Sequence, residues 1–109
     1  MISEEKVRLV FGLLKTAREE AYEAAKAEMD AKASLKDCEW GVLTSDPCPI
    51  DGRNAEHREA QLAMLVAGEK DAYLIMKDRN AKAEMNLELA KDRIECLRIM
   101  IDIAKLREN

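Results

Sequence analysis

Few residues of this chain could carry catalytic chemistry, and histidine is the scarcest of them. His57 is the only histidine, and it lies in the stretch NAEHREA between Glu56 and Glu59. A general base usually needs an orienting partner and an adjacent nucleophile or pocket, and this motif supplies neither. The sequence also lacks a phosphate-binding glycine loop and a serine nucleophile elbow. We therefore expect a solvated surface histidine and a protein that is not an enzyme.

The three cysteines, Cys38, Cys48 and Cys96, are the next candidates, for a metal site or a disulfide. Cys38 and Cys48 have no second pair of Cys or His residues nearby, so the spacing of a zinc site is not met. The N-terminus lacks the pattern of a secretory signal, which favours free thiols in a reducing compartment over a disulfide. Cys96 lies within a helical pattern, where we expect a small core residue.

Carboxylate pairs occur at Glu4 with Glu5 and at Glu19 with Glu20. A metal site in a helical bundle needs Glu and His three residues apart, pointing inward from several helices, and this sequence has no such pair. We therefore predict neither a metal ligand nor a cofactor, and expect these carboxylates on solvated faces. The six methionines could line an adaptable binding groove, but core filling is the simpler interpretation.

Basic residues of the C-terminal segment are the candidates for nucleic-acid contacts. Copies of this basic edge, repeated in an oligomer, could form a positive track although the chain carries a net charge of −4. The simpler alternative is pairing with Asp78, Glu84, Asp92 and Glu95 on the same helix. The candidate residues are Lys77, Arg79, Lys91, Arg93 and Arg98.

The composition indicates which elements must position these residues. The chain has 109 residues, of which 48% are hydrophobic, 37% charged and only 4% aromatic, a composition typical of long helices and coiled coils. A chain of this length forms one domain at most and buries a modest core, so association with copies of itself is an option. No apolar run approaches the ~20 residues that cross a bilayer. We expect a soluble, cytoplasmic protein without membrane contact.

Apolar spacing predicts a first helix over about residues 3–36. Ser3 is a plausible N-cap, with Glu4 and Glu5 placed against the positive end of the helix. Apolar and small residues then recur at alternating steps of three and four, which is a heptad stripe. Its members are Val7, Val10, Leu14, Ala17, Ala21, Ala24, Glu28, Ala31 and Leu35.

The second half predicts a short helix over about 55–67 and a long helix over about 70–107. Asn54 is a good N-cap, and GEKD from Gly68 interrupts the apolar pattern. The stripe then resumes at Tyr73, Met76, Asn80, Ala83, Leu87, Ala90, Ile94, Leu97, Ile101 and Ala104. We refer to the two stripes together as the seam.

The segment 38–54 is expected to be the connecting loop. Pro47 and Pro49 block helix, and Gly52 provides freedom in the sign of φ. Four apolar residues could fold back onto the tip of the hairpin, namely Trp40, Val42, Leu43 and Ile50. The two long helices would each span roughly 50 to 57 Å, so they can cover each other. The fold predicted is all-α: a long antiparallel, coiled-coil-like helical hairpin, occupying residues 1–109 as a single domain.

Apolar residues outside the seam predict assembly into an oligomeric bundle. A lone pair of helices cannot cover them, least of all in LRIMIDIAKL at residues 97–106. Asn80 lies at a core position, where a buried amide commonly fixes register or oligomeric state, unless it turns toward solvent. We expect a dimer or larger homo-oligomer with Asn80, Ile99, Met100, Ile103 and Leu106 at the interface.

A family resemblance lies in the stretch GRNAEHREAQLAMLVAGEKDAYLIM, which a long charged helix follows. Gly52, Arg53 and Asn54 lead into Arg58, Glu59 and Ala60, and this pattern resembles small all-helical phage and prophage proteins. Those proteins are similar to recombination mediators that bind single-stranded DNA. The resemblance implies an oligomeric recombination or replication accessory that binds single-stranded DNA. The alternative, based on the excess of apolar surface, is a coiled-coil adaptor or inhibitor that binds another protein.

Overall fold

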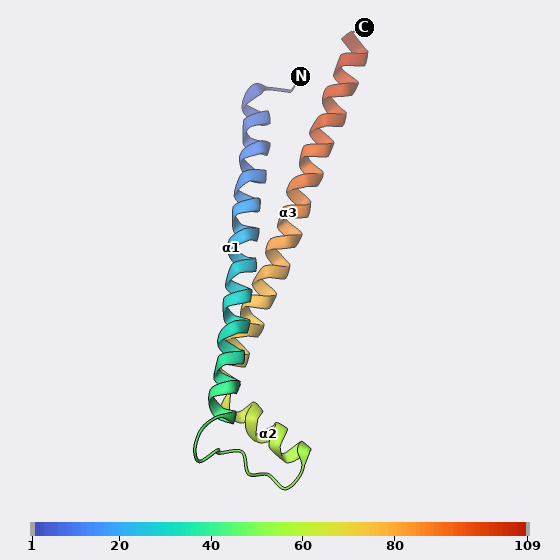
Figure 1. The fold of residues 1–109 in the computed structure, drawn as a ribbon. Coiled ribbons are helices and arrows are strands. Elements are labelled where there is room, and N and C mark those ends of the chain that lie inside the picture. The colour runs from blue at the N-terminus through green and yellow to red at the C-terminus, as the bar shows by residue number, and fades with distance from the viewer. Residues whose placement is uncertain (1, 109) are drawn as a thin grey trace. The chain divides into compact units, whose positions relative to one another are not determined.

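The computed structural model describes residues 2–108 and consists of three helices (Figure 1). They are α1 (Glu4–Leu43), α2 (Ala55–Leu65) and α3 (Ala67–Glu108). The predicted all-α fold is confirmed, with α1 and α3 as the long antiparallel pair. Within residues 2–108, no helix has a stretch long and apolar enough to cross a membrane.

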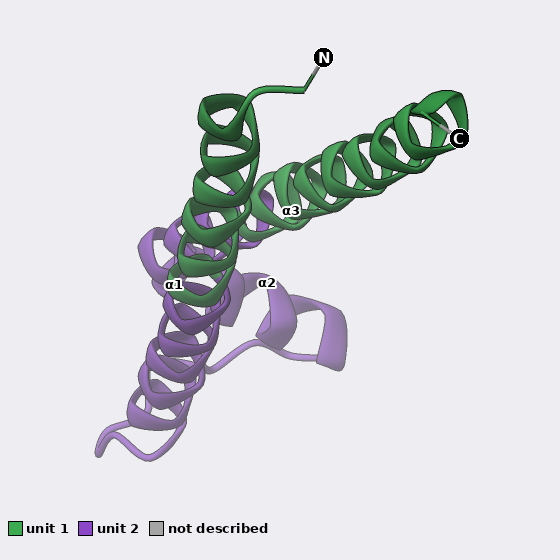
Figure 2. Ribbon diagram, turned by 90° about the horizontal axis from the view of Figure 1, so that it is seen from above, with its two compact units in different colours: residues 1–24, 80–109 green, residues 25–79 purple. Residues whose placement is uncertain are grey.

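The chain divides into two compact units (Figure 2). Unit 1 consists of residues 1–24 and 80–109, and unit 2 consists of residues 25–79. Unit 1 therefore contains the first part of α1 and most of α3. Unit 2 contains the remainder of α1, the loop, α2 and the first turns of α3. We describe each unit by itself.

The start of α1 confirms the predicted N-cap. The backbone N–H of Lys6 donates to Ser3 Oγ at 3.1 Å, which satisfies one of the free donors at the helix end. Glu4 and Glu5 lie in the first turn, where the helix dipole favours negative charge. Arg8 pairs with Glu4 at 2.7 Å, but both side chains are exposed, so the pair adds at most about 0.5 kcal/mol.

The end of α1 lies at Leu43 and not at about Lys36, so the predicted boundary was wrong. The sequence before Pro47 contains no residue that prevents helix, and the hydroxyls after Leu43 satisfy its last carbonyls. Thr44 Oγ1 donates to the Trp40 carbonyl and Ser45 Oγ to the Gly41 carbonyl, each at 2.7 Å. The Trp40 carbonyl also accepts from the Thr44 backbone N–H at 2.9 Å, and the Ser45 N–H turns to the Val42 carbonyl, so the Ser45 hydroxyl takes the place of a backbone donor at Gly41.

The loop is consequently shorter than expected, and its apolar residues are not all covered. Trp40 and Leu43 lie on α1 and are exposed, Trp40 by 70%, which corrects the expectation that they fold back. Val42 and Ile50 are half-buried. Gly52 was expected to provide freedom in φ, but its φ is not positive. Its role is a close approach, because an added Cβ would lie 2.7 Å from His57 Cβ.

Gln61 attaches the loop to α2, a contact that the sequence did not predict. Its Oε1 accepts from the backbone N–H of Gly52 at 2.8 Å and of Asp51 at 3.1 Å. Its Nε2 donates to Asp51 Oδ1 at 2.7 Å, and Arg58 Nη1 donates to the Gly52 carbonyl at 3.3 Å. The glycine lets the loop backbone lie against α2, and the amide of Gln61 then satisfies that backbone.

The junction of α2 and α3 lies at Val66 and not at Gly68. Asn54 caps α2 as predicted, since its Oδ1 accepts from the His57 backbone N–H at 2.9 Å. The predicted bounds were displaced, because α2 ends at Leu65 and α3 begins at Ala67, with Gly68 inside its first turn. Val66 is buried and ends the helix with a non-helical ψ of 14°. A buried side chain, and not glycine flexibility, marks the break.

The seam packs as the heptad pattern predicted. Each of its members is buried or half-buried in the structure. In unit 1, Leu14 and Ala17 of α1 form a cluster with Ala90 of α3, and Leu87 and Ile94 pack against it. Alanine at these positions lets the two helices approach closely but removes little apolar area from water. The helices of unit 1 then diverge toward the two termini (Figures 1 and 2).

Unit 2 has a smaller buried core. Leu35 of α1 and Val66 are its buried residues in the described part of the chain. A shallow depression of about 210 Å³ lies beside Val66, with Glu39 and Lys70 among its lining residues. The Lys70 ammonium lies 6.0 Å from the centre of the Tyr73 ring, at the outer limit of a cation–π contact.

The alanines of the seam provide a direct test of this packing. Ala90 is buried whereas Ala81, on the same helix, is exposed. We expect Ala90→Leu to lower the free energy of unfolding by about 1–3 kcal/mol, because the larger side chain separates the helices. Ala81→Leu, the matched control, should change it by less than about 0.5 kcal/mol. Urea denaturation followed by circular dichroism measures both, and equal effects would contradict the packing.

Candidate functional site

The residues considered for catalysis are not assembled into a site. His57 is exposed, as predicted for a surface histidine. Among residues 2–108, no group of three or more His, Cys, Asp or Glu side chains is placed to hold a metal ion.

The three cysteines are free thiols in the structure, with Cys38 half-buried and Cys48 and Cys96 exposed. The prediction that Cys96 is a core residue was wrong, because it lies on α3 away from the seam. Partial burial raises the pKa of the Cys38 thiol. The carboxylate of Glu69, which accepts a hydrogen bond from this thiol, raises the pKa further, and the negative charge of Glu39 adds to the effect. Cys38 is therefore a thiol with reduced nucleophilicity at neutral pH.

The five basic candidates are all exposed, but they do not share one edge. If the seam occupies heptad positions a and d, then Lys77, Lys91 and Arg98 fall at position e, on one flank of α3. Arg79 and Arg93 fall at position g, on the other flank. Lys77 and Arg79 belong to unit 2, and the other three belong to unit 1. The single basic edge expected from the sequence is therefore divided between two flanks.

Two of these basic residues are paired with acids on their own helix. Lys91 Nζ lies 3.2 Å from Glu88 Oε1, and Arg98 Nη2 lies 3.0 Å from Glu95 Oε1. All four side chains are about half exposed or more, so each pair contributes between about 0 and 1 kcal/mol. The predicted pairing with acidic residues of the same helix is thus confirmed for Lys91 and Arg98. Glu88, the partner of Lys91, was not among the predicted partners.

The predicted interface residues occupy two different environments. Asn80 is half-buried within the seam, and its Oδ1 is withdrawn from solvent, so the amide does not turn outward. Ile99, Met100, Ile103 and Leu106 are exposed, Leu106 by 75%. Four large apolar side chains therefore face water at the end of α3, as the sequence predicted, while their contact with another chain stays a prediction.

Five of the ten exposed large apolar side chains in the described part of unit 1 lie on one flank, which we call the apolar face. They fall at heptad positions c and g of both helices, and these positions lie on the same side of an antiparallel pair. Each is between 40% and 63% exposed. The apolar face consists of Leu9, Leu13, Leu89, Met100 and Ile103.

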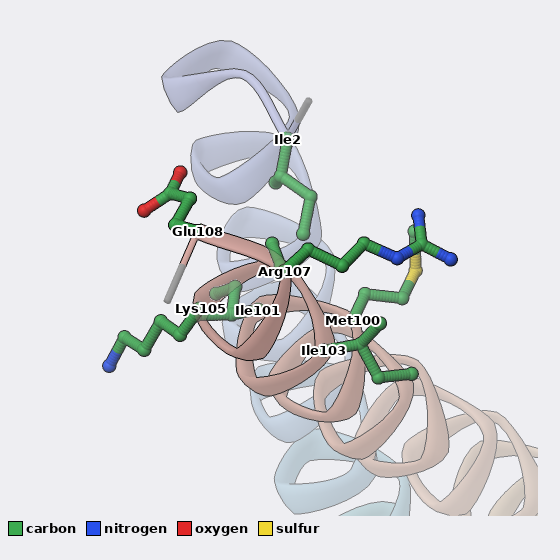
Figure 3. Close-up of a pocket in the computed structure, with 8 residues that line it drawn as sticks. Ile2, Met100, Ile101, Ile103, Lys105, Arg107 and Glu108 are labelled. Atoms are coloured by element: carbon green, nitrogen blue, oxygen red, sulfur yellow. The ribbon is translucent and has the colours of Figure 1, made fainter.

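Two grooves follow the apolar face. The first, of about 240 Å³, is lined by Leu13, Thr16, Ala17, Glu20, Asn86, Leu89, Ala90 and Arg93. The second, of about 600 Å³, lies where the helices diverge and is lined by Ile2 and the last turns of α3 (Figure 3). There Met100 and Ile103 lie on one side of α3 and Lys105 on the other.

The opposite flank of unit 1 is mainly charged. It holds the Lys91–Glu88 and Arg98–Glu95 ion pairs of α3, together with Lys15 and Arg18 of α1 at positions b and e. Phe11 and Tyr22 are the exposed aromatic residues on this flank. Unit 1 thus has one flank on which large apolar side chains alternate with polar residues such as Glu20 and Arg93, and an opposite flank that is mainly charged.

Comparison of the chain with family models, with curated proteins and with solved structures returns no match. The resemblance to phage recombination proteins therefore stays a prediction. The excess of apolar residues over the seam is evident in the sequence, but their assignment to one flank was missed. Reading Leu13 and Leu89 at positions g and c would have placed them together.

The raised pKa of Cys38 predicts the pH dependence of its alkylation. In a Cys48→Ser, Cys96→Ser background, the thiolate of Cys38 should form at higher pH than an ordinary cysteine, so iodoacetamide reacts slowly at neutral pH. Glu69→Gln removes a nearby negative charge and should move the rate profile to lower pH. Glu56→Gln, far from Cys38 in sequence, is the control. A profile unchanged by Glu69→Gln would contradict the assigned contact.

Proposed function

We propose that this is a non-enzymatic helical protein that acts by binding another protein chain through the apolar face of unit 1. The observation that carries this proposal is the placement of Leu9, Leu13, Leu89, Met100 and Ile103 on one flank, beside two grooves that apolar and polar residues line together. Contiguous exposed apolar surface rimmed by polar residues marks interaction sites in soluble proteins.

Burial of the apolar face would contribute more free energy to binding than the exposed ion pairs of unit 1 would. Complete burial of a Leu, Ile or Met side chain contributes about 1.5–3 kcal/mol relative to full exposure. The five side chains of the apolar face are each roughly half exposed, so covering them would contribute several kcal/mol in total. The exposed ion pairs on the other flank contribute about 1 kcal/mol or less each. A protein partner therefore gains more from the apolar face than from any charged feature of unit 1.

Binding of single-stranded DNA is the second candidate function. Its support is that Lys77, Arg79, Lys91, Arg93 and Arg98 are all exposed and could reach phosphates. Against it stand the net charge of −4, the division of these residues between two flanks, and the intrahelical pairing of Lys91 and Arg98. The apolar face has no role in a contact dominated by phosphate, so it favours the protein-binding proposal.

Photo-cross-linking in cells that carry the gene separates these two functions. We expect benzoylphenylalanine in place of Ile103 to give protein adducts, because that position lies on the apolar face. The same residue in place of Phe11, which lies on the charged flank of unit 1 and is already aromatic, is the matched control and should give few adducts.

Mass spectrometry identifies the partner, and nuclease digestion detects nucleic acid. Protein adducts that form at position 103 and are resistant to nuclease would support the proposal. Nuclease-sensitive adducts at position 103, or equal yields of protein adducts at both positions, would contradict it.

A further inference from the structure

We infer that the Asp51–Gly52 pair, in the loop between α1 and α2 (Figure 1), is a site where aspartate isomerises spontaneously to isoaspartate. In the folded chain, the side-chain amide of Gln61 suppresses this reaction. The inference concerns a covalent modification within unit 2 and is independent of the function proposed for unit 1. It rests on the residue pair itself and on the hydrogen bonds that hold both reacting groups.

The reaction needs no reagent other than water. The amide nitrogen of Gly52 loses its proton and bonds to Asp51 Cγ, and a carboxyl oxygen leaves as water, which gives a cyclic imide. Water then adds to the imide at the former main-chain carbonyl carbon of Asp51 and breaks the bond from that carbon to the nitrogen. The main chain now runs through Cγ, and the former carbonyl group is a free carboxylate. Mass and net charge are unchanged.

The sequence singles out this pair. Glycine follows aspartate or asparagine at no other position, and the other aspartates precede residues that carry a side chain. Because glycine has no Cβ, its nitrogen approaches the preceding carboxyl group with the least steric hindrance. Its backbone also adopts the conformations that closure of the ring requires. Asp51 is therefore the aspartate with the highest intrinsic rate of isomerisation in this chain.

The fold itself requires glycine at residue 52, so the reactive pair is a consequence of the loop. An added Cβ would lie 2.7 Å from His57 Cβ and 3.0 Å from the backbone nitrogen of Arg58. Non-bonded carbon atoms normally lie about 3.5–4.0 Å apart, so a side chain here would displace the loop from α2. The chain keeps the glycine and needs another means of limiting the reaction.

Gln61 provides this protection because it holds both reacting groups at once. Its Oε1 accepts from the Gly52 N–H at 2.8 Å, and this hydrogen is the one that the nitrogen must lose before it attacks. Its Nε2 donates to Asp51 Oδ1 at 2.7 Å and fixes the carboxylate on the amide. Closure of the ring must break both hydrogen bonds. The rate in the folded chain therefore follows the fraction of time for which the loop is detached from α2.

Isomerisation would release the loop from α2. The main chain gains a methylene group between Asp51 and Gly52, and the side-chain carboxylate that accepts from Gln61 no longer exists. Both contacts of the Gln61 amide depend on these two groups. The new carboxylate is the group that protein isoaspartyl methyltransferases recognise, so the modified chain would be a substrate for that class of repair enzyme.

Ageing of the purified full chain at neutral pH is the first test. Methyltransferase labelling measures isoaspartate, and fragmentation mass spectrometry locates it at residue 51. We expect Gln61→Met to accumulate isoaspartate several-fold faster than wild type, because Met keeps the helix propensity but has no amide. Arg58→Met, the matched control, removes the 3.3 Å bond to the Gly52 carbonyl and leaves Gln61 in place. It should stay close to wild type. Equal rates in the two variants would overturn the role of Gln61.

Ageing of the wild-type chain in guanidinium chloride is the second test and does not depend on a variant that folds. Denaturation separates Gln61 from both reacting groups, so isoaspartate should form several-fold faster than in the native chain at the same pH. Equal rates in the native and denatured chains would overturn the protection. Absence of isoaspartate at residue 51 in the denatured chain would overturn the site itself.

Discussion

Close contact between α1 and α3 through alanine is the constraint on which the rest of unit 1 depends. Small residues at Ala17 and Ala90 bring the two helices together, and larger side chains at these positions would separate them. The same choice leaves little apolar area in the seam, so leucine, isoleucine and methionine are placed on a flank. The apolar face is therefore a consequence of how the helix pair is built.

The rest of the chain shows how the hairpin is closed. In unit 2, hydroxyls of Thr44 and Ser45 end α1, and Asn54 starts α2. Gln61 then fixes the loop through the backbone of Gly52, where a side chain would collide with His57. The segment that contains both prolines thus functions as a connection with its own hydrogen bonds, and its cysteine, Cys48, is exposed.

Heptad spacing was sufficient to predict the fold class and the seam, and residue type predicted the caps at Ser3 and Asn54, because these features depend on local periodicity and local hydrogen bonds. Heptad spacing misplaced the end of α1 and the junction at Val66. The residues that determine these two boundaries lie outside the heptad stripe. Cys96 was misplaced because the prediction used only its position within a helix and not its heptad position, c, which lies outside the seam. The exposed basic residues were predicted correctly. Their division between two flanks became clear only when each was assigned its heptad position, e or g. Partner and assembly do not follow from periodicity.

The central claim is that the alanine-rich seam of unit 1 buries too little apolar area by itself. Stable folding would then depend on a partner at the apolar face. Thermal unfolding followed by circular dichroism over a wide range of protein concentration tests it most directly. If a second copy completes the core, the midpoint temperature rises with concentration, because only the folded state binds the partner. A midpoint that is independent of concentration would contradict the predicted self-association and would mean that the alanine-rich seam suffices by itself.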